Sequence, residues 1–344
     1  MQNSPEIIPP VTEQQLNDTL DTLKLVSQEL AKVIVGQETV VKQLLISILA
    51  GGHCLLEGVP GLAKTLMVSS LAQTLALNFK RVQFTPDLMP SDIIGTEILE
   101  TDHDSGDRFF KFQQGPVFTN ILLADEINRT PPKTQAALLE AMQERSISYA
   151  GKHYSLPKPF FVLATQNPVE QAGTYPLPEA QLDRFLMFVR VDYPSALEEV
   201  EILRRTTGSH SADLQHVLKG EDILLLQKLV RDVAISDPLM TYVADLVRHT
   251  RPRQQADSIC PQINAFVQWG AGPRAGQALV LCAKASALMD GRFAITLEDI
   301  HAIAQPVLRH RILLNFQAEA QHTTADDVIT ALLDQVPKPA DPFQ

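Results

Sequence analysis

The chain has 344 residues, of which 45% are hydrophobic, and this composition predicts a globular protein long enough for two domains. Its 40 acidic residues outnumber 29 basic ones, and the net charge of −11 argues against a dedicated nucleic-acid binder, which needs a basic surface. No apolar run approaches the ~18 to 20 residues of a membrane span, and the N-terminus lacks the pattern of a signal peptide. We therefore expect a cytoplasmic protein without a membrane span. Three widely separated cysteines predict buried thiols rather than disulfides or a zinc site: Cys54, Cys260 and Cys282.

The first part of the chain predicts a leader followed by two helices. Residues 1–12 contain three prolines and no apolar period, which is typical of a mobile segment. From Glu13 onward, apolar residues recur at helical spacing, and the helix is expected to end near Val35-Gly36. A second helix is expected over 39–49, before Gly51-Gly52.

Strand and helix patterns then alternate as far as about residue 191. The expected strands are 54–56, 81–85, 121–124, 161–165 and 185–191, and the expected helices between them are 66–75 and 133–142. Continuous apolar strands separated by helices predict an α/β fold, an αβα sandwich with a parallel sheet covered on both faces.

Two hairpins interrupt this alternation, and the chain becomes helical after about residue 194. The hairpins are expected over 94–112, inside an insertion of about 92–119, and over 146–156. Hairpins of this kind are either contact devices or plain surface elaborations. The expected later helices are 196–205, 221–234, 238–251, 274–289, 297–311 and 325–335. We therefore predict an α/β domain over 13–205, a smaller all-α domain over 206–337 and a tail over 338–344.

One segment has the composition of a phosphate-binding loop. It follows the apolar strand at 54–56 and reads Gly58-Val59-Pro60-Gly61-Leu62-Ala63-Lys64-Thr65, with Leu66 opening the next helix. Such a loop needs glycines that turn backbone N–H groups toward phosphate, a lysine for the β- and γ-phosphates and a hydroxyl for Mg²⁺. Ala63 departs from the general pattern, which has a second glycine there. A plain turn between strand and helix is the alternative reading of the segment alone.

The strand at 121–124 ends in two acids, Asp125 and Glu126. Carboxylates at the end of a buried strand are costly unless they are compensated, and a metal ion with a polarised water would compensate them. We assign Asp125 to the metal shell and Glu126 to activation of the attacking water. The alternative is a strand that runs into a solvated acidic turn.

Together these motifs resemble those of the MoxR family of AAA+ ATPases. The segments that carry the resemblance are Val35-Gly36-Gln37, Gly58 to Thr65, Leu122 to Arg129, Ala164-Thr165-Gln166-Asn167-Pro168 and Leu177 to Phe185. The resemblance spans about residues 13 to 316. In that family an alanine is the usual residue at the position of Ala63, and the segment 92–119 corresponds to the insertion in the second helix of the clade.

The resemblance implies further roles, each with a plainer alternative. It implies that Asn167 is the first sensor, rather than a turn residue before Pro168. Arg184 resembles an arginine finger that acts on a neighbouring subunit, rather than a surface partner of Asp183. Arg274, at the start of a helix, matches the second sensor, which reaches from the lid back to the phosphates.

The remaining assignments concern the base pocket and the subunit interface. Val35 and Gly36, with Ile34, are expected to line the adenine pocket, or else to be ordinary core and turn. Arg129 and Arg145 lie near the expected interface, where exposed ion pairs are the plainer reading.

The sequence thus predicts a nucleotide-binding α/β domain followed by a helical lid. The resemblance implies a Mg²⁺-dependent ATPase that binds ATP, forms a homo-oligomeric ring, expected to be a hexamer, and remodels or activates a partner protein. MoxR-like proteins commonly work with proteins that carry a von Willebrand factor A domain. Two alternatives are a DNA-dependent AAA+ motor and a nucleotide-controlled binding scaffold with little hydrolysis.

Overall fold

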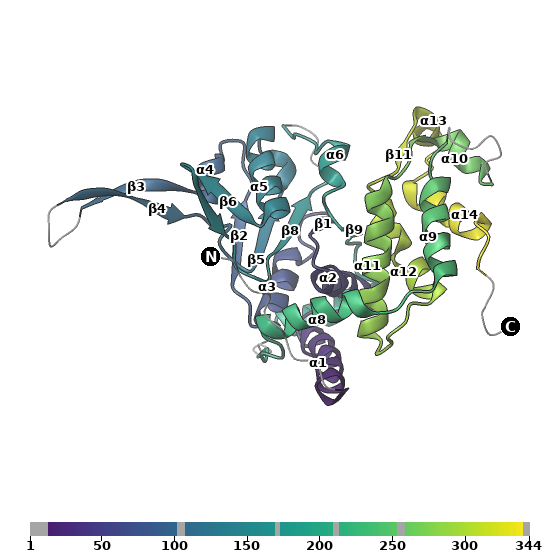
Figure 1. Cartoon of the computed structure of the whole chain (residues 1–344), viewed down its shortest axis with the longest axis horizontal. Helices are drawn as coiled ribbons and strands as arrows, with labels where there is room; N and C mark the ends of the chain where they lie inside the picture. Colours follow the sequence, from purple (N-terminus) through teal and green to yellow (C-terminus); the bar gives the residue numbers. More distant parts are fainter. Residues whose placement is uncertain (1–12, 102–106, 169–172, 209–212, 253–258, 340–344) are drawn as a thin grey trace.

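A five-stranded parallel sheet forms the centre of the molecule (Figure 1). The computed structural model describes residues 13–101, 107–168, 173–208, 213–252 and 259–339, so the predicted leader and the end of the tail lie outside the described residues. The strand order is β2-β5-β8-β1-β9, and every neighbouring pair is parallel. The strands are β1 (Cys54–Glu57), β2 (Phe79–Gln83), β5 (Ile121–Asp125), β8 (Phe161–Gln166) and β9 (Met187–Arg190).

Both faces of this sheet are covered, because successive side chains of a strand point to opposite sides. In β1, Leu56 belongs to one buried cluster and its neighbour Leu55 belongs to the other. The continuous apolar strands of the sequence therefore reflect burial on both faces. The helices of the first face are α1 (Glu13–Ala31), α2 (Glu38–Leu49) and α3 (Lys64–Thr74), and those of the second are α4 (Pro90–Ile94) and α5 (Pro132–Glu144), which follows the short turn η1 (Ile127–Arg129).

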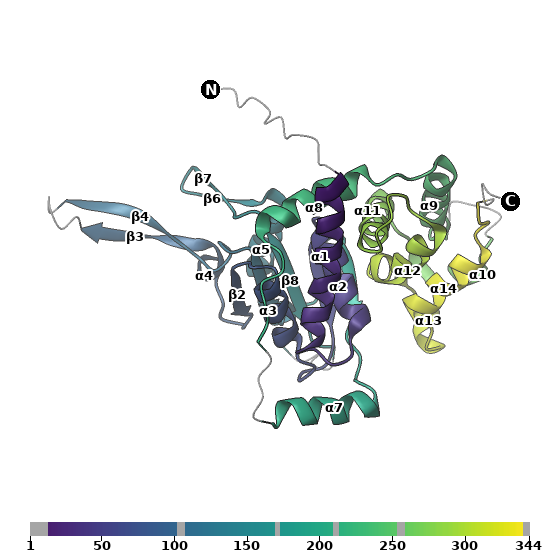
Figure 2. The same ribbon diagram turned by 90° about the horizontal axis from the view of Figure 1, so that it is seen from below.

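Two antiparallel hairpins leave the second face. The long one, β3 (Gly95–Thr101) with β4 (Arg108–Gln114), projects far from the sheet in Figures 1 and 2. The short one pairs β6 (Ser146–Tyr149) with β7 (Lys152–Ser155). The Phe112 ring stacks on Tyr154 with 4.3 Å between centroids, so the short hairpin supports the base of the long one. Residues 102–106 of the predicted tip lie outside the described residues.

Helices dominate the chain beyond β9. After the short α6 (Glu179–Leu182) that precedes that strand, they are α7 (Ala196–Thr206), α8 (Gly220–Asp232), α9 (Asp237–His249), α10 (Pro261–Phe266), α11 (Pro273–Met289), α12 (Leu297–Leu308), α13 (Phe316–Ala320) and α14 (Ala325–Gln335). The group packs on the α/β part through contacts of α12 with β9 and of α11 with α2. In the described ranges, no helix is both long and apolar enough to cross a membrane.

The helical part departs from the all-α expectation in one place. Two short antiparallel strands, β10 (Val267–Trp269) and β11 (Leu313–Leu314), pair beside α10. Asn315 fixes this pairing, because its side-chain amide donates to the carbonyl of Ala265 and its backbone N–H donates to the carbonyl of Phe266. Strands of two and three residues are too short for a periodic pattern, so no pattern in the sequence indicates them. The predicted buried, unbridged state of the three cysteines is confirmed.

Candidate functional site

The segment between β1 and α3 has the backbone of a tight loop that opens a helix. Gly61 has a φ of 89°, and Ala63, which precedes the first residue of α3, is left-handed with φ 53° and ψ 24°. A left-handed conformation favours glycine, which explains why the general pattern has one at this position. A Cβ on Gly58 would lie 2.9 Å from the carbonyl oxygen of Val191, so the loop passes too close to the chain after β9 for a side chain there.

Lys64 lies where this loop meets the acids of β5. Its ammonium donates to the carbonyl oxygen of Gly58 at 2.5 Å. Partial burial lowers the pKa of Lys64, while the carboxylates of Asp125, Glu126 and Glu57 act in the opposite direction. The structure therefore brings together the lysine and both acids that the sequence singled out, with the Thr65 hydroxyl next in the chain.

Thr165 holds the acid pair in place and was not predicted as a site residue. Its hydroxyl donates to Oδ1 of Asp125 at 2.6 Å and accepts from the backbone N–H of Glu126 at 2.9 Å. The other oxygen of Asp125 accepts from two nitrogens of Arg81, at 2.6 and 3.0 Å. Asp125 is thus an oriented carboxylate with charged and neutral donors.

Glu126 leaves the strand in a left-handed conformation, with φ 57° and ψ 50°. Its Oε2 accepts from the side-chain amide of Gln83 at 2.7 Å and from Arg129 at 3.1 Å. Arg129 thus forms an ion pair with Glu126, which agrees with the alternative that this arginine is part of an ion pair rather than of a subunit interface. Arg145, by contrast, donates to the carbonyl of Gly51 at 2.8 Å.

All five parallel strands end in a polar residue at the same edge of the sheet. These residues are Gln83, Asp125, Gln166, Glu57 and Arg190, in the spatial order of the strands. Asn167, the predicted first sensor, directly follows Gln166 and is buried. Ligands of open parallel sheets bind at the carboxyl ends of the strands, so this row marks the functional edge. An apolar strand with a polar last residue was the signal that could have revealed Gln166, Glu57 and Arg190. Gln83 ends a mixed strand, Phe79–Gln83, and left no such signal.

An apolar pocket lies beside the phosphate-binding loop, under α7. Predicted residues that line it are Val35, Gly61, Leu62, Ala63 and Leu66, together with Ile34, and α7 contributes Ile202, Arg205 and Thr206. Gly36 does not line this pocket. It has a φ of 67°, and a side chain there would collide with the carboxylate of Glu198 in α7. Arg205 ties α7 to the end of α1 through the carbonyl of Ala31 at 2.9 Å.

Arg184 and Arg274 lie together, beside a different hollow that no residue of the loop 58–65 lines. Arg274 pairs with Asp183 at 3.5 Å, and the buried Arg311 pairs with the same carboxylate at 2.8 Å. The exposed guanidinium of Arg184 has no hydrogen bond or ion pair with the part of the chain that the structure describes. The catalytic roles of both arginines stay predictions.

The fold and the strand-end site define an AAA ATPase with a helical lid. Residues 53–187 match the model of the ATPase family associated with various cellular activities, and residues 263–332 match the AAA lid domain. The chain is 42% identical to the chaperone MoxR1 of Mycobacterium tuberculosis over 96% of this chain and 86% of that protein. It is 32% identical to the MoxR protein of Paracoccus denitrificans, with coverage of 90% and 94%. A crystal structure of a candidate ATPase from Cytophaga hutchinsonii superimposes with a TM-score of 0.87 at 43% identity, covering 94% of this chain and 97% of that one.

These matches extend over most of the chain and include both its parts. The chain therefore belongs to the MoxR family of AAA ATPases, as the sequence motifs implied.

Proposed function

We propose that this protein is a Mg²⁺-dependent ATPase that works as a homo-oligomeric ring, a hexamer, and remodels or activates a partner protein. The observation that carries the proposal is the convergence of Lys64, Asp125 and Glu126 at one edge of the sheet. A site built only to bind nucleotide has no need of a second, oriented carboxylate, so the pair favours hydrolysis over a binding scaffold.

The donor set fits a nucleotide triphosphate and its metal. Lys64 and the backbone of 58–63 would hold the phosphates, and the apolar pocket under α7 would take the base. The hydroxyl of Thr65 and the carboxylate of Asp125 are oxygen ligands of the kind that Mg²⁺ prefers. When bound, Mg²⁺ supplies positive charge that neutralises the phosphate oxygens.

Glu126 is the residue assigned to proton transfer. A water molecule attacks the γ-phosphorus, the bond from that phosphorus to the bridging oxygen of ADP breaks, and Glu126 takes the proton of the water. Asn167 is assigned to orient the same water. Gln83 and Arg129 hold the Glu126 carboxylate at 2.7 and 3.1 Å, which restricts its orientation before reaction.

Two features support a ring. Arg184 lies on the surface beside a hollow that no residue of the loop 58–65 lines, so it can complete the site of a neighbour, while Arg274 keeps its predicted role as the second sensor of the lid. The second feature is α7, which borders the base pocket and stands out from the body in Figure 2. The outer face of α7 exposes Leu197, Val200 and Leu203, with Leu197 85% exposed, and such a stripe is expected to be covered in an assembly.

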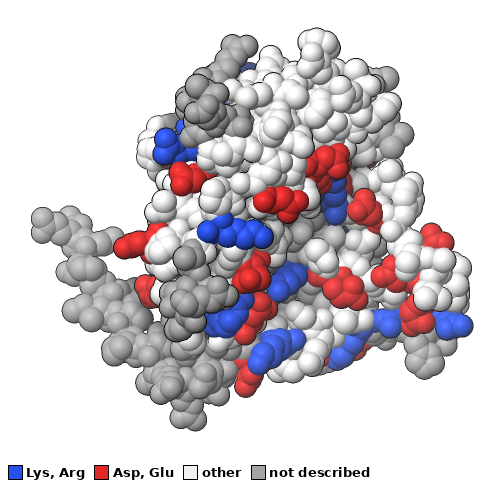
Figure 3. Space-filling view, turned by 90° about the vertical axis from the view of Figure 1, so that its right-hand side faces the viewer, with Lys and Arg blue, Asp and Glu red and all other residues white. Residues whose placement is uncertain are grey.

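The partner is proposed to be a protein rather than DNA. MoxR1 is named a chaperone, and the resemblance implies a partner with a von Willebrand factor A domain. The long hairpin β3–β4 exposes Leu99 and Phe110, apolar side chains that suit contact with a protein. On the face shown in Figure 3, acidic and basic side chains are interspersed, and they do not form the basic field that a DNA motor needs.

The test separates binding from turnover. Glu126→Gln is expected to keep ATP affinity within ~3-fold and to lower phosphate release by at least ~100-fold, because it removes only the proton acceptor. Lys64→Ala is expected to weaken binding of a fluorescent ATP analogue. Wild-type turnover by Glu126→Gln would remove the assigned base, and strong stimulation by DNA with a steep salt dependence would favour the motor instead.

A further inference from the structure

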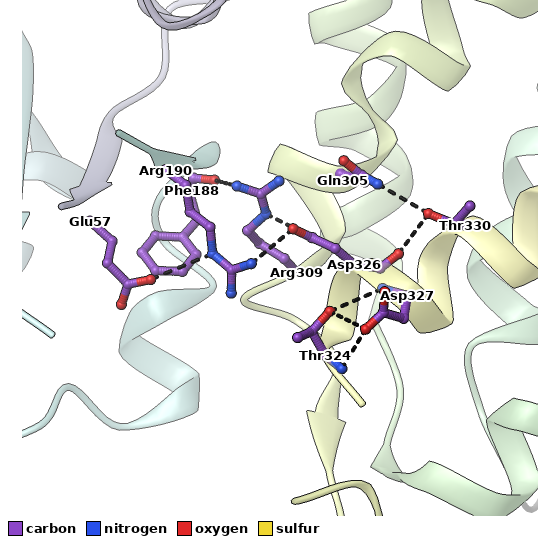
Figure 4. Close-up of polar contacts among 9 residues, drawn as sticks. All are labelled: Glu57, Phe188, Arg190, Gln305, Arg309, Thr324, Asp326, Asp327 and Thr330. Atoms are coloured by element: carbon purple, nitrogen blue, oxygen red, sulfur yellow. Dashed lines mark hydrogen bonds and ion pairs between the residues drawn. The ribbon is translucent and has the colours of Figure 1, made fainter. Parts of the chain in front are cut away.

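Arg190, the last residue of the edge strand β9, lies between the two parts of the molecule. Its Nε pairs with Oε2 of Glu57 at 3.5 Å, and its Nη1 donates to Oδ2 of Asp326 at 2.9 Å (Figure 4). Glu57 belongs to β1 of the sheet, while Asp326 lies in the first turn of α14, in the lid. One guanidinium thus bonds carboxylates of both parts.

On the sheet side, Glu57 adjoins two segments with predicted catalytic residues, the loop that begins at Gly58 and the loop that begins at Asn167. It is the last residue of β1 and the neighbour of Gly58, where the phosphate-binding loop begins. Its Oε1 accepts from the side-chain amide of Gln166 at 3.0 Å, and Gln166 directly precedes Asn167. The Glu57 carboxylate is also one of the charges that act on Lys64.

On the lid side, Asp326 is held by a second arginine. Its Oδ1 accepts from Nε of Arg309 at 3.0 Å, and Arg309, which is only 8% exposed, also donates to the carbonyl of Phe188 in β9 at 3.3 Å. Thr330 and the cap of α14 at Thr324 further fix this turn of the lid (Figure 4). Movement of α14 must therefore move Asp326 as well, and it must lengthen or break the hydrogen bond between Asp326 and Arg190.

We propose that Arg190 is a positioning residue that couples lid helix α14 to the loops that begin at Gly58 and Asn167. The proposal rests on the proposed ATPase site. The chain of bonds runs from Asp326 through Arg190 and Glu57 to Gln166, and its members are partly shielded from water, which strengthens charge-assisted bonds. When the lid moves, Arg190 loses or regains its bond to Asp326, and its pairing with Glu57 changes with it. The loops that begin at Gly58 and Asn167 then lose or regain the support of the Glu57 carboxylate.

The single tryptophan of the chain reports on this junction. Trp269 lines the same hollow as Glu57, Arg190 and Arg309, and it belongs to the lid part. We expect a non-hydrolysable ATP analogue with Mg²⁺ to change its fluorescence in the wild-type protein. Trp269→Phe would confirm the origin of the signal.

Substitution of Arg190 or Asp326 is expected to remove the response of Trp269 while the nucleotide still binds. Arg190→Ala and Asp326→Asn should keep the affinity for a fluorescent ATP analogue within ~3-fold and lower kcat by about 10-fold, and the double variant should lose little more than either single one. Arg190→Lys should give an intermediate kcat and an intermediate Trp269 response, because an ammonium keeps the charge but cannot bond two carboxylates in the geometry of a guanidinium.

Arg292 offers a matched control. Its side chain is 37% exposed, as is that of Arg190, and it also bonds two carboxylates of the lid, Asp290 and Asp299. Asp290 pairs in turn with Lys42 of α2 at 3.2 Å, so this group also joins the two parts, but it contains none of the strand-end residues. Arg292→Ala is expected to lower the melting temperature and to keep kcat within ~2-fold and the Trp269 response intact.

The outcomes separate this inference from the proposed function. A wild-type protein that binds no nucleotide would overturn the proposed function itself. Binding without a Trp269 response in the wild type, or an unchanged response and kcat in Arg190→Ala, would overturn the coupling alone. Effects of Arg190→Ala and Asp326→Asn that simply add would also overturn it, because two members of one chain of bonds cannot act independently.

Discussion

Thr165→Val tests whether the Thr165 hydroxyl holds the acid pair. Thr165 is fully buried, and valine keeps its shape but removes the hydroxyl. The change leaves the Glu126 N–H without its acceptor and removes one donor from Asp125. An unmade bond of this kind costs ~1 to 3 kcal/mol, and because both acids are partly exposed we expect a loss of about 2 kcal/mol in the free energy of unfolding. Since the bond also fixes Glu126 in its left-handed conformation, kcat is expected to fall ~10- to 100-fold.

The assay is the melting temperature together with steady-state phosphate release. Thr165→Ser keeps the hydroxyl and should stay within ~3-fold of wild-type kcat. Thr74→Val is the matched control, because Thr74 is equally buried and donates only to the carbonyl of Ser70 within α3. It should lower stability and leave turnover unchanged. A Thr165→Val protein with wild-type melting and turnover would refute the reasoning.

Two further predictions concern stability. Because Ala63 is left-handed, Ala63→Gly should raise the free energy of unfolding by up to ~1 kcal/mol and Ala63→Val should lower it, as measured by urea unfolding; an order of Val above Gly would contradict the assignment. Burial lowers the pKa of His53 to about 4, so the unfolded chain binds the proton more readily and stability falls as the pH drops from about 6.5 toward 4. His53→Gln should reduce this loss by ~3 kcal/mol at most, seen as a smaller shift of the urea midpoint between pH 7.5 and 5. An equal shift in both proteins would show that His53 does not contribute.

Much of the fold could be predicted because its elements leave periodic patterns. Four of the five strands, β1, β5, β8 and β9, are buried on both faces, so each appears as an apolar run, and each long helix has an apolar stripe. The two-stranded pairing of Val267–Trp269 with Leu313–Leu314 could not be predicted, since it joins short segments far apart in the chain. The first helix ends at Ala31 rather than near Val35, and no pattern distinguishes a helix end from the turn that follows it.

The candidate site was predictable only where one short segment carries the chemistry. Lys64 follows a glycine-rich loop, and Asp125 and Glu126 end one strand, so spacing alone pointed to them. Thr165 and Gln83 act through the register of neighbouring strands, which the sequence does not specify. The role of Arg184 could not be predicted from spacing either, because the ATPase site on which it is proposed to act belongs to another copy of the chain.

The central claim is that each ATPase site is shared between two subunits. Lys64→Ala lacks the lysine but presents an intact Arg184, whereas Arg184→Ala has the reverse defect. Each variant alone should be nearly inactive. In an equal mixture that exchanges subunits, half of the sites have Lys64, and half of those lie beside a neighbour with Arg184. About one quarter of the sites should therefore be active. Phosphate release by the mixture measures this directly. Recovery to that level is the result predicted here, and a mixture no more active than its components, or full activity of Arg184→Ala alone, would contradict the shared site.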